Sequence, residues 1–203
     1  MIEIKNICHK YGDETVLHGI DLTIEKGSFT ILAGESGSGK STLLSIVSTL
    51  LKPTEGSVLF EGKAVAHMPN LDSFRNMQIG FVFQFHYLIS YLTVYENVAM
   101  VTRRSSDEID ALLERLGIAA LKNKYPDEIS GGQRQRAAIA RAMINEPAYI
   151  FADEPTGNLD SVNTASVFSL LRQTDATVIV ATHDLSQVRE SDRIITLKDG
   201  KVC

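Results

Sequence analysis

The segment GESGSGKS, from Gly34 to Ser41, has the residue types and spacing of a phosphate-binding loop, G-x-x-x-x-G-K-[ST]. Glycines allow such a loop to wrap around phosphate oxygens with its backbone N–H groups. Lys40 is expected to neutralise the β- and γ-phosphates of a nucleotide, and the Ser41 hydroxyl to reach Mg²⁺. A glycine-rich turn capped by serine is the structural alternative, but the strand pattern before the loop and the helix pattern after it favour phosphate binding.

A second chemical feature is the carboxylate pair Asp153 and Glu154, which ends the apolar segment YIFADE. Alone, an acidic pair after a strand usually only meets solvent. A phosphate loop, however, needs a carboxylate from another strand to hold its metal ion. We therefore predict that Asp153 binds Mg²⁺ through water, and that Glu154 faces the γ-phosphate and acts as general base toward the attacking water.

The third feature is the start of the helix in DEISGGQRQRAAIARAM, residues 127–143. Ser130 and Gln133 have the spacing of a capping box. Gly131 and Gly132 destabilise the first turn by about 1 kcal/mol each relative to alanine, and a capping box does not require them. Because glycine leaves the N–H groups of a helix tip open to an anion, we predict that a phosphate approaches this tip.

Short apolar segments that alternate with amphipathic ones must position these features. The alternation predicts an α/β fold with a parallel sheet covered on both faces. The early strands and the helical block from about Phe85 to Asn145 are expected to be additions to that sheet. Besides the glycine-started helix, the predicted strands are 2–7, 16–24, 28–34, 57–62, 79–83, 148–153, 176–182 and 193–202, and the predicted helices are 40–50, 105–116 and 162–172.

Composition narrows the class of protein. The 203 residues, 44% hydrophobic and 22% charged, suit one soluble globular domain. A net charge of −5 argues against broad nucleic-acid binding, so no nucleic-acid partner is expected. Cys8 and Cys203 make neither a disulfide framework nor a metal cluster, which favours a reducing compartment such as the cytosol. No segment approaches the roughly 18 apolar residues of a spanning helix, and the first residues alternate like a strand, so the chain is expected not to cross a membrane by itself.

With Gly34–Ser41, Ser130–Gln133 and Asp153–Glu154 in this order along the sequence, the chain resembles the nucleotide-binding domain of ATP-binding-cassette proteins, and ISGGQ resembles the signature of that family. The resemblance covers nearly the whole chain. It implies a P-loop NTPase fold, with a RecA-like, mostly parallel sheet, an antiparallel β subdomain and an inserted α-helical subdomain. The single domain, 1–203, would then comprise a nucleotide-binding core at about 1–84 and 146–203 and a helical subdomain at about 85–145 that carries the signature.

The resemblance also assigns roles to single residues. Tyr11 matches the aromatic residue that stacks on adenine, and Gln84 matches the glutamine that senses Mg²⁺ and the attacking water. Asp160 matches the aspartate after the acidic pair, and His183 matches the histidine that contacts the γ-phosphate. Each would have an ordinary structural explanation if it stood alone.

The expected site therefore binds ATP and Mg²⁺. Catalytic roles fall to Lys40, Gln84, Glu154 and His183. Metal-binding roles fall to Ser41, Gln84 and Asp153. Nucleotide-binding roles fall to Tyr11, Gly34, Glu35, Ser36, Gly37, Ser38, Gly39, Lys40, Ser41, Thr42, Ser130, Gly131, Gly132, Gln133 and Asp160.

In the family that the chain resembles, two copies pack head to tail, and the signature helix of one closes over ATP in the phosphate loop of the other. This implies an ATP-dependent homodimer. It also implies integral membrane permease subunits as partners, and a peripheral location at the cytoplasmic face of the inner membrane.

The segment FQFHYLISYLTVYENV, residues 83–98, is unusually apolar and aromatic. It either seals the hinge between subdomains or forms the surface that receives a helix of the permease. Together with DEPTGNLD, residues 153–160, it looks most like the branch of lipoprotein-releasing, macrolide-export and cell-division ATPases. A mechanical or regulatory role, and a soluble cassette ATPase, stay open as alternatives.

Four features depart from the family pattern. Ile129 stands where leucine usually opens the signature, a swap that should cost under about 1.5 kcal/mol. Ser90 replaces a common proline, which predicts a less rigid docking loop. The segment between Asn97 and Glu128 is shorter than usual, and the sequence ends at Cys203 without the C-terminal helix that is customary in the family. The last two bear on dimer stability and partner fit more than on ATP chemistry.

Overall fold

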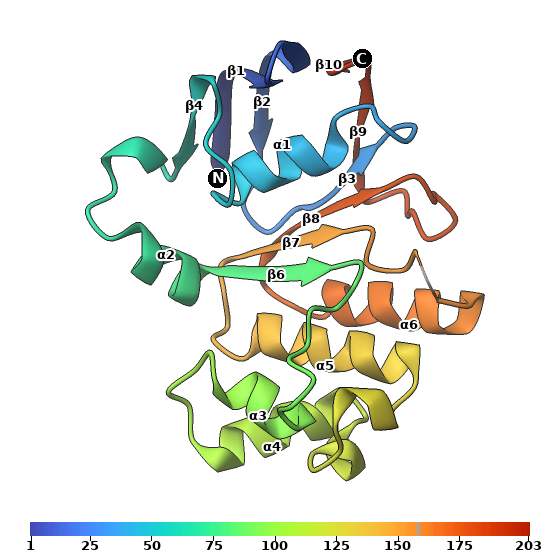
Figure 1. Ribbon diagram of the computed structural model, residues 1–203. Helices are drawn as coiled ribbons and strands as arrows, with labels where there is room; N and C mark the ends of the chain where they lie inside the picture. Colours follow the sequence, from blue (N-terminus) through green and yellow to red (C-terminus); the bar gives the residue numbers. More distant parts are fainter. Residues whose placement is uncertain (158) are drawn as a thin grey trace.

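The computed structural model describes residues 1–157 and 159–203. Its strands form two sheets, one of six strands in the order β10-β9-β3-β8-β7-β6 and one of four strands in the order β2-β1-β4-β5 (Figure 1). The mixed α/β architecture with one mostly parallel and one antiparallel sheet agrees with the P-loop NTPase fold expected from the sequence.

The six-stranded sheet is parallel except for its short edge strand, β10. All six residues of its central strand β8, TVIVAT, are buried, as expected for a strand covered on both faces. Its strands are β3 (Phe29–Ala33), β6 (Ile79–Phe83), β7 (Tyr149–Asp153), β8 (Thr177–Thr182), β9 (Arg193–Lys198) and β10 (Lys201–Val202).

The four-stranded sheet is antiparallel throughout. Its strands are β1 (Ile2–Tyr11), β2 (Glu14–Ile24), β4 (Glu55–Phe60) and β5 (Lys63–Ala64). Strand β1 extends four residues beyond the predicted end at Ile7, because His9, Lys10 and Tyr11 pair with Leu17, Thr15 and Glu14. Register shifts along this pairing interrupt the alternation from which the strand was predicted.

Helices cover the sheets and connect their strands. The α-helices are α1 (Lys40–Val47), α2 (Leu71–Gln78), α3 (Val94–Ala99), α4 (Ser106–Arg115), α5 (Gly131–Met143) and α6 (Ser161–Arg172). Single 3₁₀ turns are η1 (Val65–His67), η2 (Ala119–Leu121) and η3 (Pro126–Glu128). Helix α4 begins with a capping box between Ser105 and Glu108, and Gly117 follows the helix with a positive φ of 68°.

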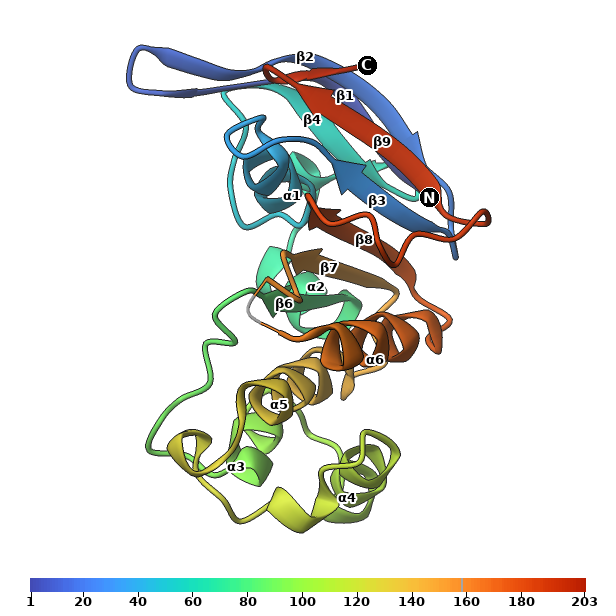
Figure 2. The same ribbon diagram turned by 90° about the vertical axis from the view of Figure 1, so that its right-hand side faces the viewer.

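Two hydrophobic clusters lie on opposite faces of the six-stranded sheet, because successive residues of each strand point to opposite sides. Ile150 and Val178 pack in the cluster that includes residues of α3 to α6. Their neighbours Phe151 and Ile179 pack in the cluster that includes α1 and the antiparallel sheet. Figure 2 shows α1 between the two sheets, with α5 and α6 beyond β6 and β7. The predicted cover on both faces of the sheet is confirmed.

Within the two described ranges, no helix is both long enough and apolar enough to span a membrane.

Candidate functional site

The phosphate loop connects β3 to α1 and is packed tightly against its own chain. Gly34 has a φ of +153°, and a Cβ atom built there would lie 2.4 Å from the carbonyl oxygen of Leu197 in β9. A larger residue would collide with backbone, so the sequence needs glycine at the first position of the loop for a steric reason.

Lys40 occupies the interior of the loop. The residue is only 6% exposed, and its Nζ donates hydrogen bonds of 2.8 Å to the carbonyl oxygens of Gly34 and Glu35. The ammonium group thus lies among the loop's own backbone, where it can neutralise an anion that the loop surrounds.

A hydrogen bond between Ser41 and Asp153 connects the start of α1 to the end of β7. Ser41 Oγ donates a hydrogen bond of 2.9 Å to Asp153 Oδ1. Burial raises the pKa of Asp153, an effect that the Ser41 hydrogen bond opposes and the nearby Glu154 carboxylate reinforces. A hydroxyl and a carboxylate side by side supply the oxygen ligands that Mg²⁺ prefers, so these residues fit the metal expected from the sequence.

Glu154 is held by two groups from the end of β8. Its carboxylate accepts a hydrogen bond of 3.1 Å from Thr182 Oγ1 and lies 2.9 Å from His183 Nδ1. Its backbone has a positive φ of 43°, and its N–H donates to the Ala181 carbonyl at 2.9 Å. Non-glycine residues in the left-handed region are uncommon and cluster at functional sites, so this geometry supports a specific role for the carboxylate.

A cleft of about 800 Å³ joins the phosphate loop to Glu154 and His183. Tyr11, with 54% of its surface exposed, lies at the rim where a base could stack. The lining residues are Tyr11, Val16, Glu35, Ser36, Gly37, Gly39, Lys40, Ser41, Thr42, Gln84, Glu154, Gly157 and His183. Most of the predicted nucleotide-binding residues therefore meet at one cleft.

Sequence reasoning missed three residues of this region. Val16 and Gly157 line the cleft, and Thr182 holds Glu154. Gly157 has a clear steric reason, because a Cβ atom there would lie 2.9 Å from Gln84 Nε2. Thr182 ends an apolar strand and directly precedes His183, and this position was a signal that could have indicated a role in the site.

The tip of α5 lies outside the residues that line the cleft, as does Asp160. Ser130 Oγ accepts the Gln133 N–H at 3.3 Å and Gln133 Oε1 accepts the Ser130 N–H at 2.8 Å, so the predicted capping box is confirmed. A Cβ atom at Gly131 would meet no atom of the described residues within 4 Å. A Cβ atom at Gly132 would lie 2.7 Å from Asn163 Oδ1. One glycine thus leaves open space, and the other accommodates a side chain of the same protein.

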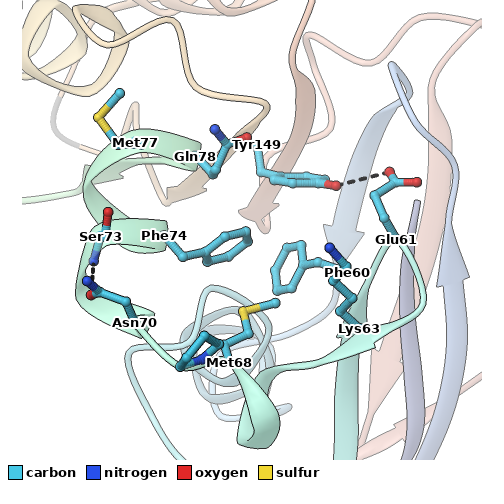
Figure 3. A pocket seen from close by; sticks show the side chains of 11 residues that line it. Phe60, Glu61, Lys63, Met68, Asn70, Ser73, Phe74, Met77, Gln78 and Tyr149 are labelled. Atoms are coloured by element: carbon cyan, nitrogen blue, oxygen red, sulfur yellow. Dashed lines mark hydrogen bonds between the residues drawn. The ribbon is translucent and has the colours of Figure 1, made fainter.

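A second cavity, of about 490 Å³, lies between β4, α2 and β7 (Figure 3). Phe60 packs edge to face on Phe74 and Tyr149, with ring centroids 5.0 and 4.8 Å apart. Tyr149 donates a hydrogen bond of 3.1 Å to Glu61, and burial together with this bond raises the pKa of Tyr149 to about 12. The lining of this second cavity includes no residue of the phosphate loop, so the larger cleft is the candidate nucleotide site.

The family model and the similar proteins all belong to one family. The family model described as ABC transporter matches residues 17–157. The bacitracin export ATP-binding protein BceA of Halalkalibacterium halodurans is 41% identical, over 100% of this chain and 87% of its own. The lipoprotein-releasing system ATP-binding protein LolD of Aquifex aeolicus is 43% identical, over 98% of this chain and 93% of its own.

Solved structures agree with the fold. A bacterial ABC transporter cassette, solved as a dimer, superposes with a TM-score of 0.91 at 39% identity and covers 100% of this chain and 96% of its own. Its post-hydrolysis dimer bound to ADP and Pi superposes with a TM-score of 0.87 at 41% identity, with the same two coverages.

Proposed function

The chain belongs to the ABC transporter family of ATP-binding cassettes and is an ATPase, and we propose that it drives a membrane permease of the lipoprotein-release or macrolide-export type. The cleft in which Glu154, held by Thr182 and His183, lies beside the phosphate loop carries the hydrolytic part of this function. The observation that supports the type of permease is the 43% identity to the lipoprotein-releasing relative LolD over 98% of this chain.

Each polar residue of the cleft has its own role in the proposed hydrolysis. Tyr11 stacks on the adenine, and Lys40 donates to the β- and γ-phosphates in place of the carbonyls that it now contacts. Glu154 accepts a proton from the attacking water, which Gln84 orients, and His183 contacts the γ-phosphate. Ser41 and Asp153, with Gln84, would hold Mg²⁺, which neutralises charge on the phosphates when bound.

We further propose that two copies assemble head to tail around ATP. Ser130 and the N–H groups of Gly131 and Gly132 then contact the γ-phosphate held by the other copy, where the dipole of α5 favours negative charge. The open space beside Gly131 supports this role. The capping box orients the tip, and Asp160 belongs to the same face. Loss of the γ-phosphate removes a charge that both copies bind, so the dimer opens.

Replacing Glu154 by Gln tests the catalytic role. We expect the ATPase rate to fall by about 10²–10⁴-fold, while ATP binding persists and an ATP-bound dimer accumulates on size-exclusion chromatography. The matched control is Glu114→Gln on the exposed side of α4, which should hydrolyse ATP at the native rate. Native turnover by the Glu154→Gln variant would refute the assignment.

An aromatic patch formed by Phe85, Tyr87 and Tyr91 supports the permease as partner. These side chains are 65%, 61% and 78% exposed, which is unusual for three neighbouring aromatic residues. Arg141 of α5 holds the backbone beside two of them, because it donates to the carbonyl oxygens of His86 and Tyr87 at 2.7 and 2.6 Å. We propose that this patch, in a helical subdomain at about 85–145, receives a helix of the permease at the cytoplasmic face of the inner membrane.

Reconstitution with candidate permeases tests the branch. We expect a permease of the lipoprotein-release type to raise the ATPase rate, and Tyr91→Ser to reduce that stimulation without changing the basal rate. Leu50→Ser, at another exposed apolar side chain, is the control. A chain that responds only to a bacitracin-export permease would move the assignment to that type, which the similar identity of the BceA relative makes the second candidate.

A further inference from the structure

Asn163, in the first turn of α6, contacts two segments that are far apart in the sequence. Its backbone N–H donates to Asp160 Oδ1 at 2.8 Å, and its side-chain Nδ2 donates to Asp160 Oδ2 at 2.9 Å. Both oxygens of the Asp160 carboxylate are therefore engaged by one residue. These bonds, the backbone one foremost, hold the pKa of Asp160 below its usual range.

The other end of the Asn163 side chain lies on the tip of α5. A Cβ atom at Gly132 would lie 2.7 Å from Asn163 Oδ1 and 2.8 Å from Cγ. The carboxamide thus occupies the space that any side chain at position 132 would need. Glycine at this position brings α6 close to the backbone of the α5 tip.

A hydrogen bond further along the same two helices adds to this contact. Arg136, one turn after Gly132, donates to Ser166 Oγ at 2.9 Å, and its other guanidinium nitrogen donates to the Leu116 carbonyl at 2.9 Å. Figure 1 shows α5 and α6 side by side, with their amino-terminal ends on the same side of the molecule. The two helices are therefore held together by the Asn163–Gly132 contact in their first turns and by the Arg136–Ser166 hydrogen bond one turn later, in addition to apolar packing.

We propose that Asn163 is a positioning residue that couples the Asp160 carboxylate to the glycine tip of α5, so that one chain presents both to the second copy as a unit. The inference rests on the proposed head-to-tail dimer. ATP bound by one copy then meets a tip whose position is set by the α6 cap, and a displacement at Asp160 is transmitted to Gly131 and Gly132. Asn163 itself touches neither nucleotide nor metal in this assignment.

The first test is a thermal double-mutant cycle, which does not depend on dimer formation. With Asn163 present, Gly132→Ala should lower the melting temperature by about 3 °C or more, because the new methyl group collides with the carboxamide. In an Asn163→Ala background the same change should cost much less, since the colliding group is gone. Additive shifts would overturn the contact and with it the coupling.

The second test measures ATP-dependent dimerisation in the Glu154→Gln background by sedimentation. We expect Asn163→Ala to raise the dimer dissociation constant about fivefold or more, and Asn163→Asp to raise it further because two carboxylates would face each other. Affinity of the single chain for a fluorescent ATP analogue should stay within about twofold of the parent. Asn123→Ala, at an exposed asparagine between η2 and η3, is the matched control.

The outcomes separate the two proposals. If Glu154→Gln dimerises and both Asn163 variants dimerise with the same constant, the coupling is wrong and the dimer stands. If Glu154→Gln itself fails to dimerise with ATP, the proposed dimer is wrong, and the thermal cycle still decides whether Asn163 positions the tip.

Discussion

The phosphate loop and the tip of α5 both contain closely spaced glycines, yet their surroundings differ. At the loop, Gly34 lies against the backbone of β9 and Lys40 bonds to two carbonyls of the loop itself. At the tip, Gly131 leaves open space among the described residues, and the nearest polar neighbour of Gly132 is a side chain of α6. The loop is thus held by contacts with its own chain, whereas the tip contacts α6 at Gly132 and leaves space at Gly131.

In the proposed head-to-tail dimer, this difference would let each chain contribute one half of each of two nucleotide sites. A loop packed on its own sheet can bind a nucleotide without help, because its donors are already oriented. The tip of α5 lies outside the residues that line the cleft, so in the proposed dimer its N–H groups would contact the phosphate of the other copy. Variants at the two regions should therefore fail in different ways.

The largest effect should come from removing the loop's cation. Lys40→Ala deletes the ammonium group that bonds to Gly34 and Glu35, and we expect ATP affinity to fall by about 100-fold or more. Ser130→Ala should leave the affinity of a single chain unchanged while hydrolysis falls. Titration with a fluorescent ATP analogue at low protein concentration measures both, and Lys63→Ala, at an exposed lysine, is the control.

Equal losses of single-chain affinity in Lys40→Ala and Ser130→Ala would remove the distinction, because the tip would then serve the nucleotide of its own chain.

A smaller effect is the difference in unfolding free energy between substitutions of Gly34 in the loop and Gly131 at the tip. Gly34→Ala should destabilise the protein by about 2–4 kcal/mol, since the methyl group meets a backbone carbonyl at 2.4 Å in a φ region that alanine avoids. Gly131→Ala should leave stability unchanged or raise it by up to about 1 kcal/mol, because alanine favours helix and meets open space. Urea unfolding measures both variants.

Gly131→Ala should still reduce ATP hydrolysis, although its fold is intact. A variant with native turnover would show that no phosphate approaches the tip at this glycine.

The sequence predicted what is local in the chain. The phosphate loop, the adjacent carboxylates Asp153 and Glu154 at the end of β7 and the capping box at Ser130 each depend on residues within one short segment. Alternating apolar segments also predicted the parallel sheet, because a strand buried on both faces has few polar residues. Strand ends were predicted less well, as the extension of β1 to Tyr11 shows.

Contacts between distant segments had no such signal. Nothing in the sequence of α6 indicates that Asn163 covers Gly132, and nothing in α5 indicates that Arg141 bonds to the backbone at His86 and Tyr87. The glycine pair was interpreted as space for a phosphate alone, whereas the packing of α6 gives Gly132 a second reason. Contacts between segments that are distant in the sequence determine which residue fits at such positions, and the local sequence pattern does not indicate those contacts.

The smallest expected effect compares the pH dependence of two carboxylates, Asp153, which is bonded to Ser41 at the phosphate loop, and Asp160, which is bonded to Asn163 beside the α5 tip. Burial raises the pKa of Asp153, so the folded state disfavours its ionised form, and this penalty is present above the raised pKa and disappears as the pH falls through it. Asp153→Asn should therefore melt about 2 °C higher than the parent at pH 7 without nucleotide, a small gain because the group stays partly solvated.

At Asp160 the hydrogen bonds from Asn163 lower the pKa, so the ionised form stabilises the fold above the unfolded pKa. This stabilisation is lost only as the pH falls through the lower folded pKa. Asp160→Asn should melt slightly lower than the parent. Thermal melts from pH 7 to pH 4 separate the two, because the advantage of Asp153→Asn should shrink over this range while the deficit of Asp160→Asn stays nearly constant. Parallel trends would mean that the two carboxylates have similar environments, and that the contrast between a buried loop and an open tip does not extend to their charges.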